Sequence, residues 1–271
     1  MTRHHSHSRQ IGLAGLLVIA GLPLTSAAAQ RVTLMAANLS GNPFLYGAPA
    51  ERIFLGLRPD VTALNEWNVR GGNHRAFVNA AFGTGFCFYV EAPAGGNPIP
   101  NGIVSRWPIR AAGSWPDRQV DNRGLAWATI DLPGPRDLHV VCVHLKSGTS
   151  GADRNTRMRQ AQSLADRIRS ANWPAADYLV IAGDLNIEHQ REPALVSLAR
   201  VVSDRRPPAD QRGSRDTNLP RNQRFDYLLP NAALEARQVP VVLGGLAFPH
   251  GLVFDSRLWN PPPPPIRPDD S

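Results

Sequence analysis

Apolar residues alternate with polar ones, or form short continuous runs, along most of the chain after residue 30, and turn-rich segments separate these runs. Runs of four to eight residues that are rich in Val, Ile, Phe and Tyr and bounded by Gly, Pro, Asn or Asp are typical of β-strands. The pattern predicts strands at Val32–Ala37, Val61–Leu64, Phe86–Val90, Gly102–Ser105, Leu125–Ile130, His139–His144, Tyr178–Ala182, Phe225–Leu229 and Val239–Leu243.

The clearest helical period covers Asp153–Ala171, where apolar residues recur on one face and most arginines lie elsewhere. Asp153 is a suitable residue to cap its start. Shorter helices are predicted at Ala50–Leu57 and Glu192–Val201. Many strands and few helices, without an internal repeat or linker, indicate one α+β domain of packed sheets.

The two ends of the chain differ from this pattern. Residues 1–29 have the form of a secretory signal peptide, with a basic start, an apolar stretch from Ile11 to Leu24 and small residues before Gln30. The alternative is an uncleaved N-terminal anchor. We therefore predict a domain over residues 30–260 and a periplasmic or secreted protein without stable membrane insertion after cleavage. The tail, residues 261–271, starts with five prolines and is predicted to be extended and to lie outside the core.

Charge and cysteine content add two expectations. The net charge is +7 and nearly all cations are Arg, which favours a polyanionic partner such as nucleic acid, although solubility alone also accounts for such a surface. Cys87 and Cys142 are the only cysteines, and an oxidising compartment would allow one disulfide. Both lie in apolar runs that suit buried free thiols equally well.

Polar and ionisable residues follow several of the predicted strands. Glu66, His144, Asp184 with Asn186, and Asp226 each stand at the end of an apolar run. Strand ends are where α/β-type folds collect ligand-binding groups. A Glu, a His and an Asp-x-Asn collected in this way suit metal-assisted attack of water on a phosphoester.

Six short motifs occur in an order that resembles the endonuclease/exonuclease/phosphatase superfamily. They are Ala37-Asn38-Leu39, Leu64-Asn65-Glu66, Gly102-Ile-Val-Ser-Arg106, Val143-His144-Leu145, Gly183-Asp184-Leu185-Asn186 and Asp226-Tyr227. The resemblance implies a four-layer α/β sandwich, in which two facing mixed β-sheets are flanked by helices. It also implies an enzyme that depends on Mg²⁺, with Mn²⁺ or Ca²⁺ as alternatives.

The resemblance assigns a role to each site residue. Glu66 and Asn38 would hold the metal ion, Asp184 would orient or deprotonate the attacking water, and Asn186 would help to bind the phosphate. His144 would donate a hydrogen bond or a proton to the phosphate or to the leaving oxygen. Asp226 would support a second catalytic His by fixing its tautomer. Alone, an Asn such as Asn38 would more often be a turn residue and a His such as His144 a structural one. The alternatives for the others are a surface Glu at a strand end for Glu66 and an Asx turn for Asp184 and Asn186.

The chain departs from the family pattern at that second His, because no Ser-Asp-His follows Asp226. His250 is the only later histidine, and the apolar run after it resembles a closing strand. The other interpretation places His250 in a loop and the missing catalytic strand beyond Ser271. We favour this second interpretation.

The expected function is that of an exported, metal-dependent phosphodiesterase, a nuclease that acts as a monomer on DNA or RNA. The alternatives are a sphingomyelinase-like phosphodiesterase or phosphomonoesterase, and a catalytically weak nucleic-acid-binding relative. On the predicted long helix, Arg154, Arg157 and Arg159 would either grip phosphates or form a solvated face. Three tryptophans have two possible roles, as stacking platforms for bases or as anchors in the core or in loops, and we favour the anchors. They are Trp107, Trp115 and Trp127.

Overall fold

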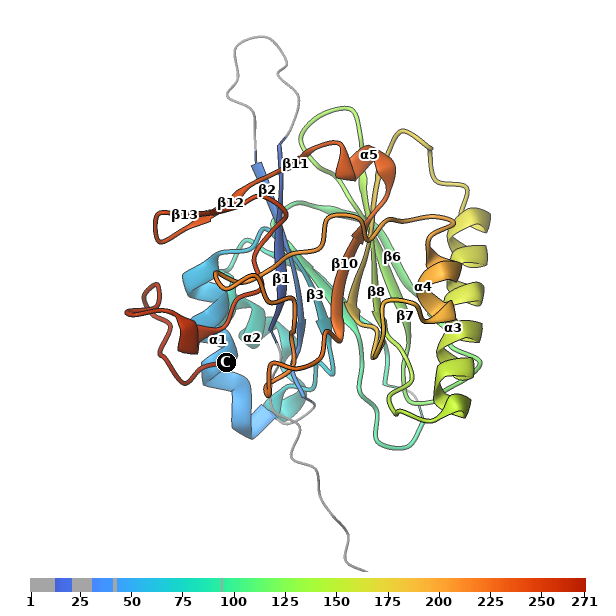
Figure 1. Cartoon of the computed structure of the whole chain (residues 1–271), viewed down its shortest axis with the longest axis horizontal. Coiled ribbons are helices and arrows are strands. Elements are labelled where there is room, and N and C mark those ends of the chain that lie inside the picture. Colours follow the sequence, from blue (N-terminus) through green and yellow to red (C-terminus); the bar gives the residue numbers. More distant parts are fainter. Residues whose placement is uncertain (1–12, 21–30, 41–42, 94) are drawn as a thin grey trace, which may run out of the picture.

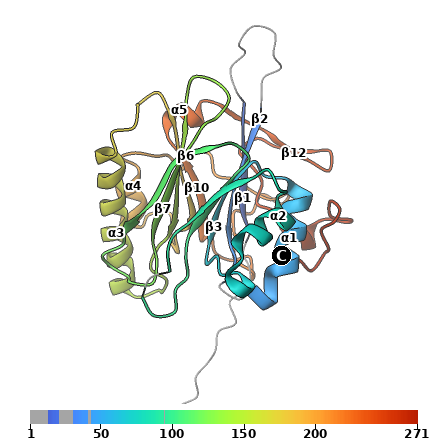
Figure 2. The same cartoon turned by 180° about the vertical axis from the view of Figure 1, so that it is seen from behind.

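The structure is a computed structural model that describes residues 13–20, 31–40, 43–93 and 95–271. Two mixed β-sheets face each other and helices cover their outer faces, as Figures 1 and 2 show from opposite sides. This arrangement confirms the expected α+β fold class with two facing sheets.

The first sheet has the strand order β11-β1-β2-β3-β5-β4 in the described chain. Its only parallel pair is β2 with β3, and the other neighbours are antiparallel. The strands are β1 (Leu13–Ala20), β2 (Arg31–Asn38), β3 (Val61–Asn65), β4 (Cys87–Val90), β5 (Gly102–Ser105) and β11 (Gln238–Val239).

The second sheet has the order β10-β9-β8-β7-β6, and its parallel pair is β8 with β9. Its strands are β6 (Ile109–Pro116), β7 (Gly124–Ile130), β8 (Leu138–His144), β9 (Tyr178–Asp184) and β10 (Asp226–Pro230). A separate hairpin joins β12 (Val241–Leu243) to β13 (Leu246–Phe248).

The helices lie on both outer faces of the sandwich (Figure 1). On the side of the first sheet are α1 (Pro43–Leu57) and α2 (His74–Ala81), and on the side of the second are α3 (Gly151–Ser170) and α4 (Pro193–Leu198). The remaining helical segments are α5 (Ala232–Glu235) and two 3₁₀ turns, Arg70–Gly72 and Ser256–Leu258. None of the helices in the described ranges has the length and apolar character that a membrane span requires.

Alternation along the strands fills three apolar layers. On β2, Val32, Leu34 and Ala36 face the second sheet, whereas Met35 and Ala37 face the helices of the first. The inter-sheet layer is completed by small and β-branched residues of β3, β8 and β9, and a third layer lies beneath α3 and α4. Each sheet is therefore buried on both faces, which explains why its strands read as nearly continuous apolar runs.

The long helix α3 begins with a capping box rather than with the predicted Asp153 cap. Ser150 is the N-cap residue, and its Oγ accepts a hydrogen bond from the Asp153 backbone N–H at 3.1 Å. The Asp153 carboxylate accepts the Ser150 N–H in return, at 3.2 Å. This reciprocal pair satisfies two N–H groups at the helix start. Four further elements, α2, α5, β6 and β13, and the two 3₁₀ turns were not predicted from the sequence.

The predictions for the two ends of the chain have different outcomes. The prediction that the proline-rich tail lies outside the core is wrong, because Ile266 is only 6% exposed and packs against α1 near Gly56. The buried Asp270 also forms an ion pair with Arg52 of α1. Part of the predicted signal peptide, Leu13–Ala20, forms β1 and pairs with β2, while residues 1–12 and 21–29 lie outside the described residues. The signal peptide itself stays a prediction.

Both cysteines are free thiols. Cys142 lies in the inter-sheet layer and donates a hydrogen bond to the Leu64 carbonyl at 3.3 Å. Its burial raises the pKa of the thiol. The buried-thiol interpretation thus fits Cys142, while Cys87 is a half-buried free thiol, and the two cysteines form no disulfide.

Candidate active site

Five polar residues extend the inter-sheet faces at one end of the sandwich. Because successive strand residues alternate between faces, a residue two positions beyond an inward-facing one also faces inward. Inward-facing small residues precede four of the five in this way, at Ala36, Ala63, Cys142 and Ala182. The five residues, which we call the polar row, are Asn38, Asn65, His144, Asp184 and Asp226.

The strand register brings the polar row together. Asn38 is paired with Asn65 across β2 and β3, and His144 with Asp184 across β8 and β9. Asp226 is opposite Asp184 on the antiparallel neighbour β10. Three strands of one sheet and two of the other therefore carry a terminal polar residue at the same end of the sandwich.

Left-handed backbone follows two of these strands. Glu66 has a φ of 53° and Asn186 a φ of 49°, in a region that residues other than glycine adopt rarely. The Asn186 backbone N–H donates to Asp184 Oδ1 at 2.8 Å, which closes a tight turn after β9. Such strained backbone positions concentrate at functional sites.

Asn38 joins two carboxylates. Its side-chain Nδ2 donates to Glu66 Oε1 at 3.1 Å and to Asp184 Oδ2 at 3.0 Å. His144 Nε2 lies 3.8 Å from each of these same two oxygens. The structure therefore brings together four of the predicted site residues, from both sheets.

Burial controls the acid–base behaviour of Asp184. Removal from water raises the pKa of its carboxyl to about 6, and the negative charge of Glu66 acts in the same direction. The hydrogen bonds from Asn38 and from the Asn186 N–H, together with the charge of Arg123, oppose that rise. A carboxyl with this pKa is mostly ionised at neutral pH and can accept a proton from water.

Asn186 is buried beside this group. Its side-chain Nδ2 donates to the Leu145 carbonyl at 3.1 Å, which uses one of its two N–H groups. The second side-chain N–H group is the one that can donate to a phosphate. The residue is 6% exposed, so its access to a ligand is through the edge of the polar row.

Asp226 reaches the polar row, but its expected histidine partner does not. The side chain is 4% exposed, and among the described residues Oδ1 has no hydrogen-bond partner. His250 is exposed in the turn after β13, and no ion pair or hydrogen bond joins it to Asp226 within the described ranges. The interpretation that a closing strand follows His250 is wrong, because Leu252 makes only an isolated bridge to Ala209.

Arg123 is a site residue that the sequence analysis did not identify. It is 7% exposed, its Nε donates to the His144 carbonyl at 2.6 Å, and its Nη2 donates to the Leu145 carbonyl at 2.9 Å. Burial lowers the pKa of its guanidinium, while nearby Asp184 and Glu66 raise it. It thus places positive charge beneath two carboxylates. A single Arg in a loop gives no sequence pattern from which this role could be predicted.

The predicted arginines of α3 are each bonded to another side chain of the protein. Arg157 has a fully buried side chain that donates to both carboxylate oxygens of Glu192, at 2.9 Å and 2.8 Å. Arg154 pairs with Glu188, and Arg159 with Gln119. Because Arg157 is fully buried and bonded within the protein, the phosphate-gripping interpretation is wrong for it, whereas for the more exposed Arg154 and Arg159 both interpretations stay predictions.

The three tryptophans are anchors. Trp107 is buried between the sheets, and Trp115 stacks against Trp127 at 5.9 Å between ring centroids beside Trp173. These rings cover the layer under α3. The structure therefore supports the interpretation of these tryptophans as anchors and not as stacking platforms for bases.

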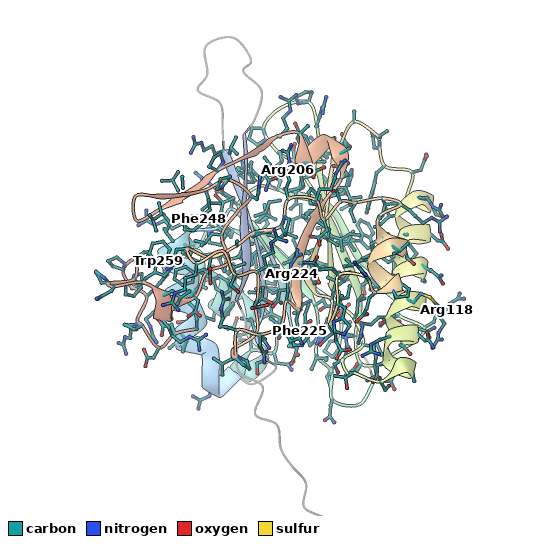
Figure 3. All side chains as sticks on the ribbon, viewed as in Figure 1. Arg118, Arg206, Arg224, Phe225, Phe248 and Trp259 are labelled. Atoms are coloured by element: carbon teal, nitrogen blue, oxygen red, sulfur yellow. The ribbon has the colours of Figure 1, made fainter. Side chains whose placement is uncertain are left out.

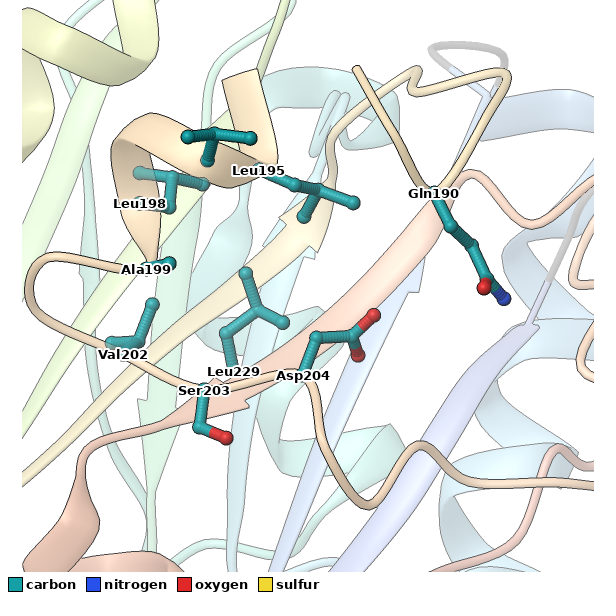
Figure 4. Close-up of a pocket in the computed structure, with 9 residues that line it drawn as sticks. Gln190, Leu195, Leu198, Ala199, Val202, Ser203, Asp204 and Leu229 are labelled. Atoms are coloured by element: carbon teal, nitrogen blue, oxygen red, sulfur yellow. The ribbon is translucent and has the colours of Figure 1, made fainter. Parts of the chain in front are cut away.

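A cavity of about 320 Å³ lies between α4 and β10, away from the carboxylate pair. Figure 4 shows Leu195, Leu198 and Val202 on one side, with Leu229 of β10 and Asp204 facing them. Asp204 accepts two hydrogen bonds from Arg224, at 2.7 Å and 2.8 Å. Arg224 precedes β10 beside Phe225, as Figure 3 shows, and so connects the cavity wall to the strand that carries Asp226.

Comparison with protein families gives one match that covers most of the chain. The Endonuclease/Exonuclease/phosphatase family matches residues 35–257. Over 96 residues the chain is 31% identical to sphingomyelinase C of Bacillus cereus, a match that covers 31% of this chain and 28% of that protein. A 30% identical stretch of the same length relates it to phospholipase C of Staphylococcus aureus, again over 28% of that protein. These matches span less than a third of the relatives' length.

Solved structures share the fold at low sequence identity. Beta toxin of Staphylococcus aureus superposes with a TM-score of 0.55 at 17% identity, over 79% of this chain and 94% of that one. A variant of beta toxin with bound magnesium ions gives a TM-score of 0.54 at 17% identity, over 81% of this chain and 95% of that one. Humanized D. rerio TDP2 gives 0.55 at 20% identity, over 78% and 88%.

Proposed function

Because the chain belongs to the Endonuclease/Exonuclease/phosphatase family, whose members are hydrolases acting on phosphoester bonds, we propose that it hydrolyses phosphodiesters at the polar row. The observation that carries the proposal is the bridge made by Asn38. Its amide holds the carboxylates of Glu66 and Asp184 together, and His144 Nε2 lies 3.8 Å from both. A ligand for a cation, a base for water and a donor for a phosphate oxygen are thus within one small site.

The donor set suits a hard divalent cation, with Mg²⁺ first and Mn²⁺ or Ca²⁺ as alternatives. Among the described residues, no three His, Cys, Asp or Glu form a metal-binding group. Mg²⁺ does not need one, since it keeps several waters and uses one or two carboxylates. Glu66 and the Asn38 amide would hold the ion, and the Glu66 side chain is 14% exposed toward this edge. When bound, the cation would polarise a phosphoryl oxygen and offset negative charge.

The protein groups would divide the remaining chemistry. Asp184, ionised at neutral pH, would accept a proton from the attacking water while two hydrogen bonds fix its carboxylate. His144 would donate from Nε2 to a phosphate or leaving oxygen, and Asn186 would donate its second N–H group. Arg123 would hold the backbone of the His144 turn from below. Asp226 would take part in catalysis only indirectly, by binding a partner group that approaches its buried Oδ1.

We favour nucleic acid as the substrate and a monomeric, exported protein as the enzyme. The net charge of +7 supports a polyanionic substrate, since arginine-rich surfaces attract phosphates over long range. The second candidate is a choline phospholipid. It is supported by the matched stretches of sphingomyelinase C and phospholipase C, and by the exposed apolar residues Val242 and Leu246 of the β12–β13 hairpin.

Parallel assays would test the reaction and the substrate. Plasmid DNA, total RNA, sphingomyelin vesicles and a generic aryl phosphodiester would be incubated with the protein, with Mg²⁺ and with EDTA. We expect nucleic-acid cleavage that requires the cation and falls at least about 100-fold in Asp184→Ala. Asp177→Ala, a variant at the opposite end of β9, serves as the control and should keep its rate.

Three outcomes would change this proposal. Sphingomyelin turnover without nucleic-acid cleavage would replace the substrate but keep the mechanism. Equal rates for the wild-type protein and Asp184→Ala on every phosphoester would refute the mechanism itself. DNA binding that weakens with salt, without turnover of any substrate, would indicate a nucleic-acid-binding relative.

A further inference from the structure

Asn65 lies beneath the carboxylate pair and is completely buried, at 0% exposure. Its side-chain Oδ1 accepts a hydrogen bond from the Asp184 backbone N–H at 2.7 Å. Its Nδ2 donates to the Val143 carbonyl at 2.9 Å and to Asn101 Oδ1 at 2.7 Å. One amide on the first sheet therefore binds the ends of β8 and β9 on the second.

The backbone of Asn65 connects the same point to the other ligands. Its carbonyl accepts the Leu39 N–H at 2.9 Å, directly after Asn38. The next residue is Glu66, which has a left-handed backbone and whose carboxylate shares the Asn38 amide with that of Asp184. Through its hydrogen bonds, or as a chain neighbour, Asn65 is connected to the backbone at or next to four site residues: Asn38, Glu66, His144 and Asp184. It cannot itself reach a substrate, because it is fully buried.

Gly183 shows how closely Asn65 approaches β9. Its φ is +131°, and a Cβ there would stand 2.6 Å from Asn65 Oδ1 and 2.2 Å from the Val143 carbonyl oxygen. Any side chain at this position would force Asn65 away from Asp184. The close approach of the two sheets at the polar row therefore depends on this glycine and this amide together.

A second layer of hydrogen bonds fixes the far side of Asn65. Asn101, which accepts from Asn65, donates its backbone N–H to Glu91 Oε1 at 2.7 Å and its Nδ2 to the Gly124 carbonyl at 2.8 Å. Glu91 Oε2 accepts the Gly124 N–H at 3.0 Å. Gly124 follows Arg123, which binds the His144 carbonyl. The Asn65 amide is therefore held in one orientation by a buried network.

We propose that Asn65 is a positioning residue that sets the separation of the Glu66 and Asp184 carboxylates. It acts through the Asp184 backbone, so it affects the geometry of water attack and of cation binding, not substrate contacts. This inference rests on the proposed hydrolysis. A displacement of about 1 Å at a reacting group can lower a rate roughly 100-fold, and loss of the bond to Asp184 frees the strand end to move.

The test compares Asn65→Ala with Asn231→Ala. Asn231 is a matched control, because its Oδ1 accepts the Leu179 N–H at the opposite end of the same strand, at 3.3 Å, and its Nδ2 donates to the Asp177 carbonyl at 3.0 Å. On an aryl phosphodiester, with rates corrected for the folded fraction, Asn65→Ala should lower kcat about 10- to 100-fold with KM within about 2-fold. The Mg²⁺ concentration for half-maximal rate should rise. Asn231→Ala should change neither quantity.

Amide hydrogen exchange separates this inference from the proposed function. The Asp184 amide should exchange faster in Asn65→Ala and unchanged in Asn231→Ala, whether or not the protein is active. Asn65→Ser, which keeps an oxygen acceptor, should fall between wild type and Asn65→Ala, and it replaces Asn65→Ala if that variant does not fold. An inactive wild-type protein would refute the proposed function. An active wild type with Asn65→Ala equal to Asn231→Ala in kcat and Mg²⁺ requirement would refute the positioning role.

Discussion

Asp184 and Asp226 are direct cross-strand neighbours on β9 and β10, and both carboxyl groups are buried. Burial raises the pKa of Asp226 well above its ordinary value, and the charge of Asp184 raises it further. The Thr217 hydroxyl and the Arg224 guanidinium oppose the rise without cancelling it. When Asp184 is ionised, Asp226 is therefore the member of the pair that keeps its proton, because two close carboxylates cannot both be charged without a large cost.

This protonation state predicts that Asp226→Asn stabilises the folded protein at neutral pH. Below the ordinary carboxyl pKa, 3.8, both folded and unfolded states carry the proton, so the substitution has little effect. As the pH rises, the unfolded chain releases the proton while the folded state keeps it, which lowers wild-type stability. The gain in the free energy of unfolding from Asp226→Asn should therefore grow from pH 4 to pH 7, as urea denaturation would measure.

Asp255→Asn is the control with the opposite sign. Burial raises the pKa of Asp255, but the hydrogen bonds and charge of Arg257 outweigh it and the pKa is lowered. That substitution should destabilise the protein, and more at pH 7 than near pH 3. If Asp226→Asn were instead less stable than wild type at pH 7, Asp226 would be an ionised carboxylate with a partner.

The rate of phosphodiester cleavage should depend on the ionisation of Asp184. With the pKa of that carboxyl near 6, kcat/KM should rise with pH through about pH 6 and then level off, because only the ionised form accepts a proton from water. A cation beside Glu66 favours the ionised form, so a higher Mg²⁺ concentration should move this transition to lower pH. A profile without a transition between pH 5 and 7 at any Mg²⁺ concentration would exclude Asp184 as the base.

Four of the five residues of the polar row were predicted from the sequence, because the ends of apolar strand runs are a local property, whereas Asn65 was assigned no role there. Asn38, His144 and Asp184 each end an apolar run, and small inward residues before them allow the sheets to approach. The helical period did not predict that Arg157 is buried, because its burial depends on the bond to Glu192, which is 35 residues away. Arg123 carried no signal for the same reason, since it binds carbonyls 21 and 22 residues later.

Misassigned segments have similar causes. Ile109–Pro116 is a strand at a sheet edge with a half-exposed, weakly apolar sequence, so its pattern is faint. The proline-rich tail was expected to be solvated from its composition, but one apolar residue, Ile266, finds a site over Gly56 of α1. Such docking depends on the shape of a distant surface, which local composition does not contain.

Arg157 should contribute to stability and not to substrate binding. Its guanidinium binds Glu192 and the carbonyls of Lys146 and Gly148 without exposure to water. Arg157→Met, which keeps much of the volume but leaves Glu192 unpaired, should destabilise by about 3–5 kcal/mol. Arg154→Ala removes a partly exposed pair and should cost about 0–1 kcal/mol. Denaturation curves would measure both, and a rise in KM for DNA, with the Arg157→Met protein still folded, would contradict the structural role.

Removal of the predicted signal peptide should open one edge of β2. In the structure, β1 pairs with β2 in register from Leu13 opposite Ala37 to Ala20 opposite Arg31, and β3 covers the other edge. We expect the exported protein to begin at Gln30, as mass spectrometry would show. In that form the β2 amides that point toward β1 should lose protection from hydrogen exchange, while those bonded to β3 keep it. The amides of β4, at the far edge of the same sheet, provide the internal control. An exported protein that retains Leu13–Ala20 would instead make that segment a permanent strand of the fold and refute the signal peptide.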